Sequence, residues 1–221
     1  MYEEIRIIIE IVSASICFIL LWFMAKPYSL TRESRYLGLP LGFGFLGVSY
    51  VVVALLISTP GAFDNELSWL QLLPRTFAFL FLAVTYYFSK KPSKRSPLIW
   101  NVTLSFLILV LVTLFIMVLI NPHLASPNYI GLSVYFRAFN LLCLFYISVY
   151  TLRRHVKNLE PKTIVIPIGF ILLGMNQYSA IIWSVDRSYF AFWGALVLRL
   201  TALVIFLFVS YKVFYSSNKG R

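Results

Sequence analysis

The sequence predicts an all-α, polytopic membrane protein, a single bundle of seven transmembrane helices with its N-terminus outside and its C-terminus in the cytoplasm. Three observations support this fold class. Hydrophobic residues make up 60% of the 221 residues and charged residues only 12%, whereas soluble domains carry roughly 25% charged residues. Seven long apolar segments follow one another along the chain. Basic residues gather in every second connection between these segments.

Each apolar segment contains about 20–25 residues, and a helix needs about 20 to cross a hydrocarbon core of about 30 Å. Strands of membrane barrels are shorter, about 10 residues, and alternate in polarity, so we expect helices. The connections are short and rich in proline, which predicts one domain over residues 1–221. The predicted spans are 5–25, 36–58, 68–89, 97–120, 130–152, 163–184 and 190–214.

The first span is predicted to be a retained helix. Its flank, Met1–Glu4, is acidic, and its apolar run is longer than the 7–15 residues of a signal peptide. No pair of small residues marks a cleavage site after it. The sequence Lys26-Pro27-Tyr28-Ser29 is predicted to form a turn that ends this helix.

The basic residues set the predicted orientation. Fourteen of the 19 lysines and arginines follow the first, third and fifth spans or lie at the C-terminal end, and such residues favour the cytoplasmic side. The net charge of +11 therefore reflects membrane topology, and no nucleic-acid partner is predicted. The expected surroundings are the lipid bilayer of the cell membrane, whose anionic headgroups attract these loops. The fourteen are Lys26, Arg32, Arg35, Lys90, Lys91, Lys94, Arg95, Arg153, Arg154, Lys157, Lys162, Lys212, Lys219 and Arg221.

Charged residues inside the spans are the strongest functional signal, because each costs about 2.5 kcal/mol or more at mid-membrane. Arg75, Arg137 and Arg199 recur at intervals of 62 residues, and Glu10 precedes them in the first span. They are predicted to lie at similar depth in the outer half of the bundle. Every helix is expected to contribute to this polar layer, although the fourth offers only Thr113. The predicted ligand-binding residues are Glu10, Tyr50, Arg75, Arg137, Asn140, Asn176, Gln177 and Arg199.

Three interpretations of these arginines remain open at this level. The guanidinium groups can reach outward to lipid phosphates, they can form structural hydrogen bonds, one of them with Glu10, or they can bind a ligand. Inward-pointing groups within about 10 Å of one another and of Glu10 would indicate a shared layer.

A second pattern suggests internal repetition. Residues 40–47 and 167–174 share the pattern P-x-G-F-x-x-L-G. Together with the 62-residue interval, it favours a two-helix hairpin repeated three times and followed by a seventh helix. The glycines of this pattern are expected to let helices approach closely.

No enzyme is predicted. His123 and His155 lie in connections on opposite sides of the membrane, so they cannot share a metal ion. Cys17 and Cys143 lie inside apolar segments, and Glu10 is the only carboxylate within the spans. These residues provide no catalytic pair, no metal site and no cofactor site.

The polar layer therefore leads to three functional hypotheses. The first is a receptor-like or sensory bundle that binds an anionic or polar small molecule and contacts a cytoplasmic partner. The second is a small transporter or channel that uses the same layer as its substrate site. The third is a structural subunit of a larger membrane complex.

Overall fold

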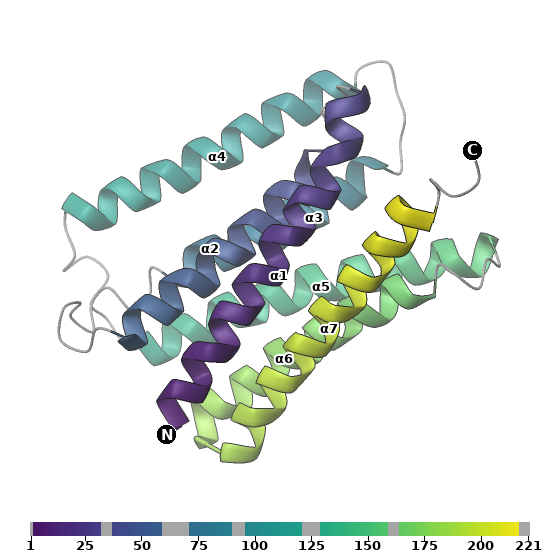
Figure 1. Ribbon diagram of the computed structural model, residues 1–221. Coiled ribbons are helices and arrows are strands. Elements are labelled where there is room, and N and C mark those ends of the chain that lie inside the picture. The colour runs from purple at the N-terminus through teal and green to yellow at the C-terminus, as the bar shows by residue number, and fades with distance from the viewer. Residues whose placement is uncertain are drawn as a thin grey trace.

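The computed structural model describes residues 2–31, 37–58, 71–89, 96–120, 129–158 and 164–216, and these residues form seven helices (Figure 1). Six helices are long and apolar enough to cross a membrane, as expected of a multi-pass membrane protein, whereas α3 has a shorter apolar stretch, Leu72–Phe88. The helices are α1 Tyr2–Thr31, α2 Gly38–Ser58, α3 Leu72–Ser89, α4 Ser96–Ile120, α5 Tyr129–Asn158, α6 Val165–Asp186 and α7 Tyr189–Ser216.

Each predicted span coincides with one helix, but two helix ends were predicted wrongly. α1 continues through Lys26 and Pro27, where a turn was expected. Pro27 lies four residues before the end of the helix, and its missing N–H removes a single hydrogen bond, the one to the Phe23 carbonyl four residues earlier. α5 continues beyond residue 152 to Asn158, and its last turns carry exposed basic side chains. The start of the third predicted span, residues 68–70, lies outside the described residues.

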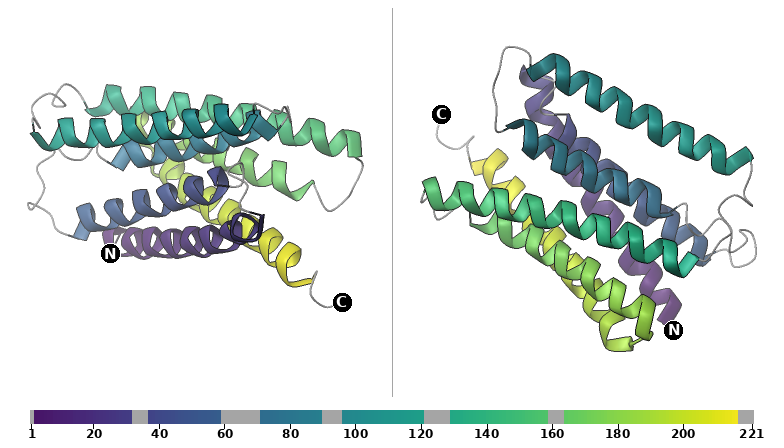
Figure 2. Two further views of the ribbon diagram at one scale, coloured as in Figure 1. Left: turned by 90° about the horizontal axis from the view of Figure 1, so that it is seen from above. Right: turned by 180° about the vertical axis from the view of Figure 1, so that it is seen from behind.

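Six helices surround a shared apolar core, and α4 lies at the edge of the bundle (Figures 1 and 2). The core contains side chains from α1, α2, α3, α5, α6 and α7. The Phe206 ring of α7 lies at its centre, 4.8 Å from the Phe170 ring of α6 and 5.6 Å from the Phe43 ring of α2. α4 packs mainly against α3, and its buried Trp100 stacks edge-on against Phe88.

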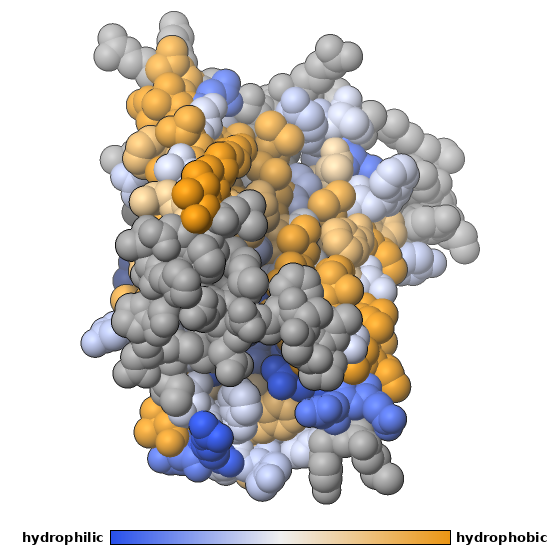
Figure 3. All heavy atoms as spheres, turned by 90° about the vertical axis from the view of Figure 1, so that its left-hand side faces the viewer, coloured by the Kyte–Doolittle hydropathy of each residue, from blue (hydrophilic) through white to orange (hydrophobic). Residues whose placement is uncertain are grey.

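The outside of the bundle is largely apolar. Leu109, Leu142 and Phe145 are among the large hydrophobic side chains that are more than half exposed. Figure 3 shows hydrophobic residues in the upper part and along the right-hand side of one face, and hydrophilic residues gathered toward its lower edge. Such a surface is unfavourable in water and suits the hydrocarbon of a bilayer.

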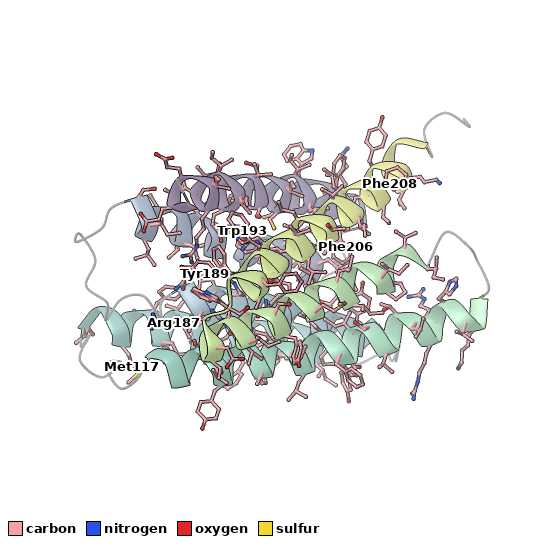
Figure 4. All side chains as sticks on the ribbon, turned by 90° about the horizontal axis from the view of Figure 1, so that it is seen from below. Met117, Arg187, Tyr189, Trp193, Phe206 and Phe208 are labelled. Carbon is pink, nitrogen blue, oxygen red and sulfur yellow. The ribbon has the colours of Figure 1, made fainter. Side chains whose placement is uncertain are left out.

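The turn between α6 and α7 fixes how these two helices pack. Arg187 has a φ of 51°, in the left-handed region, and its backbone N–H donates to the Trp183 carbonyl at 3.0 Å, which ends α6. Tyr189 begins α7 two residues later, and Figure 4 labels both residues at this corner. Since the connection is so short, α6 and α7 pack antiparallel in a fixed register.

Glycines allow close contacts between neighbouring helices. A Cβ atom at Gly42 of α2 would lie 2.6 Å from Leu82 Cγ and 3.2 Å from the Ala78 carbonyl oxygen of α3. A Cβ atom at Gly169 of α6 would lie 2.7 Å from the Phe206 ring. The close-packing role expected of these glycines is therefore confirmed at the two positions, while the hairpin repeat stays a prediction.

We expect Gly42→Ala to destabilise the bundle by about 1–3 kcal/mol, because the added methyl group forces α2 away from α3. Thermal unfolding in a mild detergent measures the effect. Gly194→Ala is the matched control, since nothing lies within 4 Å of a Cβ atom there. That control is expected to be neutral or to stabilise α7 by up to about 1 kcal/mol. Equal effects of the two substitutions would contradict the packing interpretation.

Candidate functional site

An ion pair between Glu10 of α1 and Arg199 of α7 lies inside the bundle. Arg199 Nη1 donates to Glu10 Oε1 at 3.0 Å, and the two residues are only 4% and 2% exposed. At this burial Arg199 does not reach outward to lipid phosphates, so outward orientation is excluded for this arginine. The pairing of Glu10 with one of the arginines was among the sequence-based interpretations.

The pair uses only part of its hydrogen-bonding capacity. Glu10 Oε2, Arg199 Nε and Arg199 Nη2 are buried and have no hydrogen-bond partner among the described residues. An arginine and a carboxylate commonly form two parallel hydrogen bonds, whereas one is present here. Buried polar atoms without partners cost free energy, so these three atoms mark a place where a further polar group is favoured.

Tyr50 of α2 brings a second arginine to this pair. Its buried ring lies 4.5 Å from Arg199 Cζ and 5.3 Å from Arg75 Cζ of α3. The two guanidinium carbons therefore lie less than about 10 Å apart, and both interact with the negative face of one aromatic ring. Arg75 Nε also donates to Ser49 Oγ at 3.2 Å, and Ser49 Oγ donates to the Gln71 carbonyl at 3.1 Å.

Arg137 of α5 makes different contacts. Its Nη1 donates to the Ala180 carbonyl oxygen and to Ser184 Oγ, both on α6. The side chain is 7% exposed, so this arginine also points inward. Through these two hydrogen bonds Arg137 joins α5 to α6 at the seam between the two helices.

The register of α6 and α7 places Asn176 level with Arg199. The rings of Trp183 and Phe192 pack at a centroid distance of 5.3 Å. Asn176 lies seven residues before Trp183 and Arg199 seven residues after Phe192. Because seven residues are about two helical turns, both side chains lie at the same depth. Both residues are buried.

The same reasoning aligns the polar residues of α5 and α6. Arg137 contacts Ala180; Asn140 follows three residues after Arg137 on α5, and Gln177 lies three residues before Ala180 on α6. Since these helices are antiparallel, Asn140 and Gln177 occupy one level. Asn140 Oδ1 and Nδ2 and Gln177 Oε1 are buried and have no hydrogen-bond partner in the described part of the chain.

The register of α3 and α5 extends this level to Thr76. The rings of Tyr86 and Tyr150 pack at 5.8 Å, and both helices run in the same direction. Thr76 and Asn140 each lie ten residues before their tyrosine. Thr76 Oγ1 is also buried without a partner among the described residues. Among the described residues, the polar side chains of six helices therefore form one layer next to the apolar core, with buried capacity for further hydrogen bonds.

α4 does not take part in this layer, contrary to the expectation that every helix would. Thr113 is exposed, and its hydroxyl donates to the Leu109 carbonyl of its own helix at 2.9 Å. A threonine in this geometry satisfies its hydroxyl locally, so its polarity gives no evidence of a shared site.

Three polar residues in the layer or near it were missed by sequence reasoning. Thr76 and Ser184 resemble ordinary helix residues in an apolar segment, and only their packing reveals their role. Arg6 was counted as an outer charge, yet its Cζ lies 5.5 Å from the Phe192 ring and 6.0 Å from the Trp183 ring. Its position one turn before Glu10 was the available signal.

Comparisons of this chain with protein-family models, with curated proteins and with solved structures find no match. The described residues contain no group of three histidine, cysteine or carboxylate side chains placed to hold a metal ion.

We expect Glu10→Gln to destabilise the protein by about 3–5 kcal/mol, because it leaves the buried charge of Arg199 uncompensated. The double variant Glu10→Gln with Arg199→Gln should recover much of this loss. Equilibrium unfolding in detergent measures both, with Glu3→Gln on the exposed start of α1 as the control. A double variant whose loss is the sum of the two single losses would show that the pair is not coupled.

Arg137→Met should destabilise the protein by about 1.5–3 kcal/mol, because the charged hydrogen bonds to α6 are lost while the apolar stem is kept. The same unfolding assay measures it. Arg153→Met, on an exposed turn of the same helix, should change stability by less than about 0.5 kcal/mol. If both variants are equally stable, the contacts of Arg137 with α6 contribute nothing.

Proposed function

We propose that the protein is a receptor-like or sensory bundle of the cell membrane that binds an anionic or polar small ligand in the outer half of its polar layer. All seven helices cross the bilayer in this proposal, with the N-terminus outside and the C-terminus in the cytoplasm. The observation that carries the proposal is the excess of positive charge in this layer. The guanidinium groups of Arg75 and Arg199 both lie against the Tyr50 ring, whereas Glu10 is the one buried carboxylate among the described residues.

The charges of the helix ends support the orientation. Arg153, Arg154 and Lys157 lie near the end of α5, and such residues favour the cytoplasmic side. Two acidic residues lie at the other end of the bundle: Glu3 in the first turn of α1 and Asp186 at the end of α6. The exposed basic turns of α5 are also the surface on which we expect anionic headgroups or an acidic cytoplasmic partner to bind.

The short third helix is compatible with seven spans because protein surrounds it. α3 has 18 residues, about 27 Å of helix at 1.5 Å per residue. Most of its side chains are buried between α2, α5 and α4. A helix shielded from lipid in this way needs a less continuous apolar surface than one that faces the bilayer.

Electrostatics favour an anion as the ligand. Arg199 is balanced by Glu10, whereas Arg75 contacts only the Ser49 hydroxyl and the Tyr50 ring and has no carboxylate partner among the described residues. A half-buried cation attracts an anion more strongly than an exposed one, because the surrounding dielectric constant is lower. Arg75 is therefore the residue at which we expect the negative group of the ligand.

The apolar core supports binding over transport. Directly inward of the polar layer, Phe43, Phe79 and Phe170 are almost completely buried. Glycine contacts hold α2 against α3 and α6 against α7 at this level. A substrate moving inward would have to separate these side chains, whereas a ligand entering from outside reaches the layer first.

Thermal unfolding of the purified protein in mild detergent, with acetate, lactate, succinate, benzoate and phosphate as probes, tests this proposal. At least one anion should raise the unfolding temperature in a saturable manner, because a ligand stabilises the state that binds it. Arg75→Gln should weaken that anion at least roughly tenfold, since a charged hydrogen bond is lost. Arg153→Gln, an exposed arginine of α5, should leave its binding unchanged.

The alternatives give different results in the same preparation. Flux of a stabilising anion into proteoliposomes would indicate a transporter or channel and overturn the sensory function. If no probe stabilises the protein and it purifies together with another protein in a fixed ratio, the structural-subunit hypothesis replaces the proposal. Equal binding to the Arg75 and Arg153 variants would move the site away from Tyr50.

A further inference from the structure

The ion pair of Glu10 and Arg199 has one open acceptor beside open donors. Its single contact joins Glu10 Oε1 to Arg199 Nη1. Glu10 Oε2, on the same carboxylate carbon as Oε1, has no partner among the described residues, nor do Nε and Nη2 on the guanidinium carbon of Arg199. These three atoms therefore lie close to one another, because each belongs to one of the two side-chain groups that form the contact.

Glu10 offers a negatively charged acceptor, and Arg199 offers positively charged donors beside it. A molecule that carries one positive and one negative group close together is complementary to this arrangement. An ammonium group satisfies Glu10 Oε2, and a carboxylate satisfies Arg199 Nη2 or Nε. In an α-amino acid these two groups are attached to one carbon atom, so they reach both sides of the pair together. The second guanidinium on the Tyr50 ring, that of Arg75, adds positive charge near Arg199, which favours the carboxylate of such a molecule.

A simple anion fits the pair less well. Its negative charge would approach Glu10, which is 2% exposed, and would leave Glu10 Oε2 without a donor. Like charges repel strongly where the dielectric constant is low, and an unsatisfied buried carboxylate oxygen remains costly. A zwitterion avoids both costs, because it adds no net charge and supplies the missing donor.

We propose that the ligand of this layer is a zwitterionic α-amino acid, with its ammonium group on Glu10 and its carboxylate on Arg199 and Arg75. This inference rests on the proposed ligand-binding function and names its ligand class. Both halves of the amino acid are required for binding, because each satisfies a different buried group of the pair.

The test is a thermal-unfolding screen of the wild-type protein in detergent against the twenty common amino acids, each at millimolar concentration. At least one should stabilise the protein in a saturable manner. Its N-acetyl derivative, which lacks the ammonium charge, and its decarboxylated amine, which lacks the carboxylate, should each bind at least roughly tenfold more weakly. Using unmodified protein avoids any loss of folding from substitutions in the pair.

Four outcomes decide the inference. Tight binding of one amino acid and weak binding of both derivatives supports it. Equal binding of the N-acetyl derivative overturns it, because the ammonium group would then contribute nothing. If none of the twenty stabilises the protein but acetate, succinate or phosphate does, the zwitterion is wrong and the anion-binding function stands. If neither set stabilises it, the proposed function fails as well.

Discussion

The interior of this bundle depends on one constraint, the free-energy cost of placing ionic groups away from water. Glu10 and Arg199 meet this constraint by pairing across α1 and α7, and the pair lies next to the Tyr50 ring on α2. The first, second and last helices are thereby held together at one depth. The remaining polar residues align with this level through the packing of their helices, so the position of the pair defines the geometry of the whole layer.

Much of the fold could be predicted from the sequence because lipid imposes simple rules on length and polarity. Each apolar segment became a helix, and the buried arginines were found because charge is rare in such segments. The end of α1 at Pro27 was predicted wrongly because proline near a helix end breaks few hydrogen bonds. The contact of Arg137 with α6 could not be predicted either. The regular 62-residue interval indicates how deep a side chain lies in the membrane, but it does not indicate which neighbouring helix that side chain contacts.

Two kinds of packing divide the bundle along its length. On one side of the polar layer, aromatic rings and glycines give dense contacts among α2, α3, α6 and α7. In the layer itself, several buried polar atoms lack partners among the described residues. Dense cores resist deformation, whereas a polar network specifies one structure only when all of its groups have partners. The polar layer is therefore the more adaptable level of the bundle, and the apolar core beside it is the more rigid one.

The length of α5 has a mechanical consequence. The helix has 30 residues, and its basic end continues well beyond the level at which the other helices form the core. Asn140 lies in the polar layer, and Asn158 ends the helix 18 residues later. A rigid rod of that length, about 27 Å, acts as a lever: a tilt of about 5° pivoting at Asn140 moves its far end by about 2 Å. Leu144 and Ile147 of this segment belong to the core, so such a tilt shifts their contacts slightly and moves most the end of the helix that carries Arg153, Arg154 and Lys157.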